Sequence, residues 1–257
     1  MLPYYVWALL YSSFSLLHTA YILYGSRETL IMADSLSSLW FLPVMFLAFL
    51  ITEAIMALSI KAGKGRTLYL LSGTVASFLI GFMLPHHAVY GDPWGIDVAF
   101  VASAFMLSGV FVNRVIGLMK NKKKQIAVLF ADFVVFAVCI NYSTSSTGYV
   151  LMANADYGNP LLFIVNALSG SLFVILLCSL LTNARKTRLI QWIGARTMGI
   201  FLVHKPIANT VRTISIHLNL SYDNLGVLFV ITIVTLAISC AIVLMIECVL
   251  PEIIGLN

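Results

Sequence analysis

The feature that most constrains this chain is the alternation of long apolar stretches with short polar gaps, in which lysine and arginine are concentrated in every second gap. Apolar stretches of about twenty residues recur along the whole chain, and each is long enough to cross roughly 30 Å of hydrocarbon as a helix. Basic residues cluster within 61–66, 114–124 and 185–196, whereas the gaps between these clusters hold Asp92, Asp97 and Asp156 and almost no positive charge. This is the positive-inside pattern of a polytopic membrane protein.

The composition agrees with a chain whose surface faces lipid. Of the 257 residues, 61% are hydrophobic and only 10% are charged, whereas soluble domains carry roughly 25% charged residues. The net charge of +5 indicates no nucleic-acid partner, because the basic residues sit in short gaps beside apolar stretches, where they face anionic lipid headgroups or an anionic cytoplasmic ligand. The four cysteines lie in or beside apolar stretches and are interpreted as small apolar residues.

We expect an all-α, polytopic bundle that forms a single domain over residues 1–257. Helices are expected because lipid cannot satisfy free backbone groups and the chain shows no β-type alternation. The eight predicted spans are 3–25, 39–60, 67–84, 96–119, 126–142, 160–182, 195–217 and 225–250. If the basic gaps face the cytoplasm, both termini do too, and the outer gaps are 26–38, 85–95, 143–159 and 218–224.

Three charges of mixed sign fall at one depth on the cytoplasmic side of the predicted spans: Glu53, Arg114 and Asp132. A charge inside the bilayer usually faces a partner or a wet cavity. One interpretation is a structural ion cluster. The other is that Arg114, with Lys61 or Arg196, meets an anionic ligand from the cytoplasm, since arginine binds phosphate through its planar fork.

A second polar set lies nearer the outer side. It includes His18, Asn141 and Asn166 in the outer halves of their spans, and His204 near mid-membrane, just before Lys205 and Pro206. His18 is interpreted as a helix-packing histidine, whereas His204 fits a packing role and a wet, irregular site equally well. His86 and His87 are expected in an ordinary solvated turn. Two neighbouring histidines do not make a metal site without further ligands, so no metal is predicted.

Five short strings, in order along the chain, resemble the acyltransferase-3 family, and in particular its fucose 4-O-acetylase-like branch. The strings are residues 2–7 (LPYYVW), 39–43 (LWFLP), 94–99 (WGIDVA) followed by Phe105 and Gly109, 157–162 (YGNPLL) followed by Gly170, and 193–194 (IG) followed by 201–204 (FLVH). Each string alone is weakly specific, but their order and spacing cover the whole chain.

The resemblance implies an integral membrane enzyme of ten core helices in the bacterial cytoplasmic membrane. Such enzymes take an acyl group from a cytoplasmic donor, usually acetyl-CoA, and deliver it to a hydroxyl of an extracytoplasmic polysaccharide or lipid-linked sugar. The family's expected catalytic base is a histidine in a Gly-His-Ser-type segment of its first helix, and no such segment occurs here. The expected histidine therefore falls upstream of Met1, and the eight predicted spans equal the family core without its first two helices.

Three explanations of that difference stay open: a truncated sequence, a second polypeptide that supplies the missing helices, and a decayed homologue. In each case, residues 1–257 alone are expected to be inactive. No bound cofactor is predicted, and acyl-CoA enters as a substrate. The predicted acceptor path comprises Trp40, Tyr157, Asn159 and His204, and the predicted donor side comprises Glu53, Arg114 and Asp132. The alternative function is a non-enzymatic transporter or flippase-like subunit, which also uses ionisable residues inside the membrane.

Overall fold

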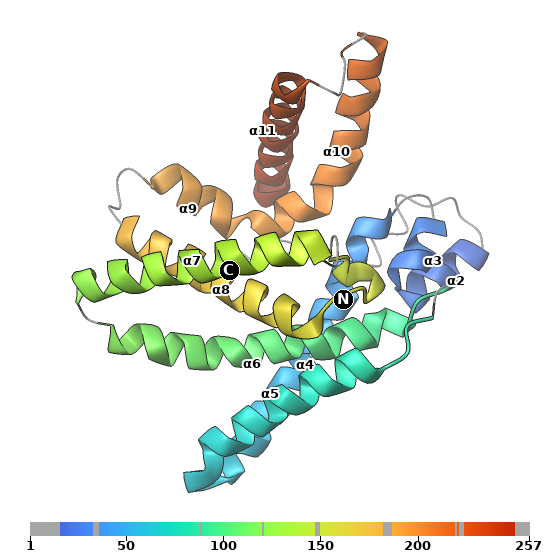
Figure 1. Ribbon diagram of the computed structural model, residues 1–257. Coiled ribbons are helices and arrows are strands. Elements are labelled where there is room, and N and C mark those ends of the chain that lie inside the picture. The colour runs from blue at the N-terminus through green and yellow to red at the C-terminus, as the bar shows by residue number, and fades with distance from the viewer. Residues whose placement is uncertain are drawn as a thin grey trace. The chain divides into compact units, whose positions relative to one another are not determined.

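The structure is a computed structural model that describes residues 16–32, 36–87, 89–119, 121–146, 150–181, 187–218, 220 and 224–249. The chain divides into two compact units, residues 1–181 and 182–257, which we describe separately. The described residues form helices and loops, with a single isolated bridge between Leu151 and Asp156 in place of any strand (Figure 1). The all-α expectation is therefore confirmed.

The first unit is built on five long helices joined by short ones. The long helices are α4 (Phe41–Lys61), α5 (Arg66–Met83), α6 (Ile96–Leu118), α7 (Lys122–Ser146) and α8 (Pro160–Leu181). The short elements are α2 (Leu16–Tyr24), α3 (Arg27–Met32) and the 3-10 turns η1 (Leu36–Trp40), η2 (Gly63–Gly65), η3 (Pro93–Gly95) and η4 (Met152–Asn154). The α6 helix packs against both α4 and α5, and α7 packs against α8 (Figure 1).

The second unit holds a short helix and a helical pair. The elements are α9 (Arg188–Ala195), α10 (Thr197–His217) and α11 (Leu225–Val249), and α10 packs along α11. Pro206 lies inside α10, which continues through it.

Six helical segments of the described residues are long and apolar enough to cross a membrane: Ser38–Lys61, Gly63–Met83, Pro93–Gly117, Lys122–Ser143, Pro160–Leu181 and Leu225–Cys248. These match six of the eight predicted spans. The predicted span 3–25 lies mostly outside the described residues. The predicted span 195–217 does form a helix, but its Lys205 and Arg212 make it more polar, and it is not among the six. The count of eight and the side on which the termini lie stay predictions.

The central helix of the first unit is α6. In its most apolar stretch 44% of residues are buried, against 6% in the corresponding stretch of α7. Helices with apolar side chains on exposed faces are expected of a bundle surrounded by lipid. The α6 helix is therefore the buried helix against which α4 and α5 pack.

The gaps predicted to face outward meet at one end of the first unit. Tyr24 donates a hydrogen bond to the Gly91 carbonyl at 3.1 Å, and Arg27 donates one to the Asn154 side chain at 2.8 Å. At the opposite ends of α5 and α6, Arg114 donates to the Thr67 hydroxyl at 3.2 Å, close to the basic gaps. Within this unit, the polar outer gaps and the basic gaps therefore lie at different ends, as the charge alternation predicts.

Candidate functional site

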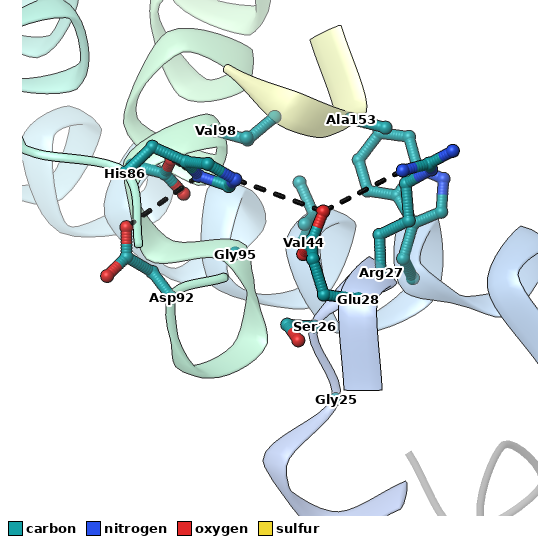
Figure 2. A pocket seen from close by; sticks show the side chains of 12 residues that line it. Gly25, Ser26, Arg27, Glu28, Val44, His86, Asp92, Gly95, Val98 and Ala153 are labelled. Carbon is teal, nitrogen blue, oxygen red and sulfur yellow. Dashed lines mark hydrogen bonds and ion pairs between the residues drawn. The ribbon is translucent and has the colours of Figure 1, made fainter. Parts of the chain in front are cut away.

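A small polar cavity lies where the outer gaps of the first unit meet. Figure 2 shows the side chains that line it, which come from the start of α3, from α4, from the loop between α5 and α6, from the first turn of α6 and from η4. The lining residues that carry polar side chains are Ser26, Arg27, Glu28, Trp40, His86, Asp92 and Asp97. Its volume of about 10 Å³ holds a single water-sized group.

Two glycines let the loop between α5 and α6 approach α3 and α4. Gly91 has φ +63°, and a Cβ at that position would collide with the carboxylate of Glu28. Gly95 has φ +57°, and a Cβ there would lie 2.6 Å from Val44. Glycine adopts positive φ without the steric cost that other residues meet. Because Gly95 caps the start of α6, it also places Asp97 in the first turn of that helix.

His86 lines the cavity, and Figure 2 shows its ring between Asp92 and Glu28. A third carboxylate, that of Asp97, also contacts it. Its Nδ1 donates a hydrogen bond to Asp97 Oδ2 at 2.8 Å and lies 4.0 Å from Asp92 Oδ2. Its Nε2 lies 3.9 Å from Glu28 Oε1, and the Arg27 guanidinium lies 3.7 Å from the same Glu28 oxygen. This arrangement gathers two basic groups and three acidic groups within one cavity.

The carboxylates of Asp92 and Asp97 are buried, but not all of their oxygens have a hydrogen-bond partner in the described residues. Asp97 is 0% exposed and Asp92 is 8% exposed. Within the described residues, neither Asp97 Oδ1 nor Asp92 Oδ2 accepts a hydrogen bond. Burial raises the pKa of the Asp92 carboxyl, and the negative charge of Asp97 raises it further. Each unsatisfied buried oxygen costs free energy, so the cavity favours a positive or hydrogen-bond-donating occupant.

The expectation of a solvated turn at the two histidines is wrong for His86. Its side chain is 19% exposed and bonded to Asp97, whereas the side chain of His87 is 70% exposed, as expected. The physical reason is that the loop folds back over the first turn of α6, which brings a buried carboxylate against the imidazole. The sequence feature that could have indicated this contact is the spacing of His86, Asp92 and Asp97. It places one acidic residue in the loop that holds His86 and another in the first turn of the helix that follows.

Of the four predicted acceptor-path residues, the structure brings two to this end of the first unit. Trp40 lines the cavity. Tyr157 is buried against Phe82 and Phe163, and its hydroxyl has no hydrogen-bond partner among the described residues. Burial, and after it the charge of Asp97, raises the pKa of the Tyr157 phenol, which therefore stays a neutral hydroxyl at neutral pH. Tyr157 does not line the cavity.

The other two acceptor-path residues have local contacts of their own. His204 belongs to the second unit, where its Nδ1 hydrogen-bonds the Phe201 carbonyl at 2.7 Å. Asn159 caps α8: its Oδ1 accepts hydrogen bonds from the backbone N–H groups of Leu161 and Leu162 at 3.0 and 3.2 Å. Pro160 follows at the first helical position, which is where proline is favoured. A role of either residue in the acceptor path stays a prediction.

The cap at Asn159 gives a testable effect on stability. Asn159→Ala is expected to lower the free energy of unfolding by about 1 kcal/mol, because two N–H groups at the start of α8 lose their acceptor. Asn159→Asp keeps a side-chain oxygen at the cap and is the matched control. Thermal unfolding of the detergent-solubilised chain, followed by circular dichroism, measures the difference. Equal losses in the two variants would contradict the capping role.

The three predicted donor-side residues lie on different helices of the first unit. Glu53 is exposed on α4, and Arg114 is exposed on α6, with its guanidinium 6.0 Å from the centre of the Phe111 ring. Asp132 is half-buried on α7, and its Oδ2 has no hydrogen-bond partner in the described part of the chain. No ion pair joins these three residues there, so the structural ion cluster finds no support.

Arg196, the other arginine considered for an anionic ligand, is already paired. Its NH2 group donates a hydrogen bond to Glu247 Oε2 at 2.9 Å, and its Nε forms an ion-pair contact with Glu247 Oε1 at 2.7 Å. The guanidinium also lies 4.4 Å from the Trp192 ring centre. Arg196 therefore stabilises the second unit, and Arg114 is the better candidate for an anionic ligand.

Comparison with known proteins gives one match. The model of the acyltransferase-3 family, described as an acyltransferase domain, matches residues 1–244. Neither the curated proteins nor the solved structures contain a match.

Proposed function

Because the chain belongs to the acyltransferase-3 family, we propose that it is part or all of an integral membrane O-acyltransferase. In this proposal an acyl group, most simply acetyl, moves from cytoplasmic acyl-CoA to a hydroxyl of an extracytoplasmic polysaccharide or lipid-linked sugar. The proposed location is the bacterial cytoplasmic membrane. The observation that carries the proposal is the family match, which extends over both units of the chain.

The distribution of charge in the first unit supports a reaction that uses both sides of a membrane. One end holds the basic residues of the α4–α5 and α6–α7 connections, including Lys61, Arg66 and Arg114. The other end holds the polar cavity with Trp40 and His86. Acyl transfer to a hydroxyl needs a site for the anionic donor and a polar site that orients the acceptor. We propose that the basic end binds the donor and that the acceptor binds beside the cavity, which itself holds only a water-sized group.

At the donor end, Arg114 is proposed to bind a phosphate of the acyl-CoA. Its side chain is exposed and its guanidinium makes only one hydrogen bond in the described residues, to the Thr67 hydroxyl. A guanidinium can therefore offer its remaining N–H groups to a phosphate as a bidentate pair. Glu53 and Asp132 are proposed to orient basic groups or to limit how deeply the donor enters.

At the acceptor end, Trp40 is proposed to stack on a sugar ring, and the neutral Tyr157 hydroxyl to hydrogen-bond it. The face of an aromatic ring packs well against the apolar face of a sugar, and a buried hydroxyl without a partner favours a polar ligand. Asn159 is proposed to lie further along this path, through the helix start that it caps, and the role of His204 in acceptor use stays a separate proposal for the second unit.

The test follows radioactive acetyl groups in membranes from cells that express the chain from its own locus. Labelled acetyl-CoA is expected to transfer label to the glycan or lipid-linked sugar fraction. Arg114→Ala is expected to raise the acetyl-CoA concentration needed for half-maximal transfer about tenfold, which corresponds to about 1.4 kcal/mol of lost binding. The matched control is Arg188→Ala, an exposed arginine at the start of α9, which is expected to change this concentration less than twofold.

A second measurement separates this proposal from the transporter alternative. Proteoliposomes that contain the chain are tested for solute counterflow. Counterflow in these proteoliposomes, together with an absence of label transfer in the membranes from cells that express the chain from its own locus, would overturn the acyltransferase proposal and favour the transporter or flippase-like subunit.

A further inference from the structure

We propose that His86, Asp92 and Asp97 form a binding site for a divalent cation of the Zn²⁺ or Mn²⁺ type at the outer end of the first unit. One potential ligand atom from each residue lies within 4.8 Å of the other two. All three side chains line the same water-sized cavity (Figure 2). This inference does not depend on acyl transfer, because it concerns the binding of a metal ion alone.

The first argument is the state of the two aspartates. Asp97 is 0% exposed and Asp92 is 8% exposed, and each has one oxygen that accepts no hydrogen bond in the described residues. Surface carboxylates commonly lack partners because water satisfies them. Buried carboxylates instead need a positive partner or donors, since removal from water is costly. Two buried carboxylates of this kind, on residues that line one cavity, indicate that a ligand completes the site.

The second argument is charge balance within the cavity. Glu28 has its own cation, because the Arg27 guanidinium lies 3.7 Å from Glu28 Oε1. Asp92 and Asp97 then remain as two negative charges beside His86, with Nε2 of the exposed His87 3.7 Å from Asp92 Oδ1. A neutral imidazole with two carboxylates is balanced in charge by one divalent cation. A protonated His86 would neutralise only one of the two.

The third argument is geometry. His86 Nδ1 lies 2.8 Å from Asp97 Oδ2 and 4.0 Å from Asp92 Oδ2. Ligand atoms about 2.0–2.2 Å from a Zn²⁺ ion in tetrahedral arrangement lie about 3.3–3.6 Å apart, so each of these two distances would change by less than about 1 Å, and the potential ligand atoms of Asp92 and Asp97 lie within 4.8 Å of each other. The metal ion would take the place of the proton on Nδ1, which would be released to solvent. The cavity of about 10 Å³ fits an ion or a water and is too small for a sugar.

The choice of metal follows from the donor set. Imidazole nitrogen suits Zn²⁺ and other transition metals, whereas Mg²⁺ and Ca²⁺ prefer sites made of oxygen ligands alone. Two carboxylates and one imidazole therefore favour Zn²⁺ or Mn²⁺ over Mg²⁺ or Ca²⁺. The ligands come from the loop between α5 and α6 and from the first turn of α6, so a bound ion would hold this loop against the helix.

Isothermal titration of the purified, chelator-treated full chain with Zn²⁺, and separately with Mn²⁺ and Mg²⁺, tests the proposal. We expect one Zn²⁺ or Mn²⁺ ion per chain, bound at least tenfold more tightly than Mg²⁺. Asp97→Asn and His86→Ala are each expected to weaken binding at least tenfold. The matched control is His87→Ala, which removes an exposed imidazole that lies 3.7 Å from Asp92 Oδ1 outside the proposed ligand set, and it is expected to change the affinity less than twofold.

Two outcomes would overturn the site: no saturable binding of either ion by the wild-type chain, or an equal loss of affinity in His86→Ala and His87→Ala. If Asp97→Asn does not fold, Asp92→Asn and X-ray absorption at the zinc edge decide the question. The absorption spectrum is expected to show nitrogen and oxygen neighbours at about 2.0–2.2 Å, without sulfur. Failure of this test leaves the acyltransferase proposal intact, because label transfer is measured independently.

Discussion

Arg196→Ala is expected to lower the free energy of unfolding of the second unit by about 3 kcal/mol. The substitution removes both contacts to Glu247, at 2.7 and 2.9 Å, and leaves that carboxylate without its cation. The side chains of Arg196 and Glu247 are only 19% and 12% exposed, so water compensates little for the loss. Removing one partner of a buried pair costs more than the pair contributes, because the remaining charge is stranded.

A double-mutant cycle measures this effect by thermal unfolding in detergent micelles. Arg196→Ala combined with Glu247→Ala is expected to be more stable than Arg196→Ala alone, because the stranded charge is also gone. Arg188→Ala, which removes an exposed arginine of the same unit, is expected to change stability by less than about 0.5 kcal/mol. If the loss of unfolding free energy in the double variant equals the sum of the losses in the two single variants, Arg196 and Glu247 do not stabilise each other.

Gly81→Ala is expected to destabilise the first unit by about 2 kcal/mol. A Cβ at position 81 of α5 would lie 2.5 Å from a methyl group of Val101, 2.9 Å from the carbonyl oxygen of Asp97 and 3.0 Å from the backbone N of Val101. Backbone atoms of α6 cannot rotate away as a side chain can, so the two helices must separate. Overpacking of this kind typically costs 1–3 kcal/mol. Small residues at such interfaces allow membrane helices to approach closely.

The matched control for Gly81→Ala is Gly109→Ala on α6. A Cβ at position 109 would have no atom within 4 Å in the described residues. That substitution is expected to be neutral or stabilising, because alanine has the higher helix propensity. Chemical unfolding followed by circular dichroism compares the two variants. A loss of stability in Gly109→Ala as large as that in Gly81→Ala would contradict close packing as the cause.

The displacement expected from Gly81→Ala also reaches the candidate site. The Asp97 carbonyl that the new methyl group would strike belongs to the residue whose carboxylate bonds His86. Metal affinity in Gly81→Ala is therefore expected to fall along with stability, whereas Gly109→Ala is expected to leave it unchanged.

The membrane helices and the family could be predicted from the sequence. Hydropathy summed over about twenty consecutive residues is a local property, so six of the predicted spans correspond to apolar helices of the structure. The ordered strings that resemble the acyltransferase-3 family are also local, and the family match over residues 1–244 confirms that resemblance. The predicted span 195–217 also forms a helix, but this helix carries Lys205 and Arg212 and is not among the six.

The candidate site could be predicted only in part. Asn159 was chosen through the resemblance for the acceptor path, and the structure shows that it caps α8, a contact that the sequence analysis did not predict. Trp40 was chosen through the resemblance, and the structure places it on the polar cavity. The grouping of Glu53, Arg114 and Asp132 rested on depth alone. Equal depth does not bring residues of separate helices together, because the rotation of each helix decides which way its side chains face.

The sequence by itself determined that this chain forms apolar helices whose basic connections alternate with polar ones, because both properties depend on neighbours along the chain. Only the tertiary structure decided that the His86 side chain is largely buried and contacts Asp97, Asp92 and Glu28. That contact needs the close approach of α5 and α6 at Gly81 and the positive φ of Gly91, which lets the loop lie against α3. The chemistry of the cavity depends on these long-range packing distances, which no pattern of adjacent residues encodes.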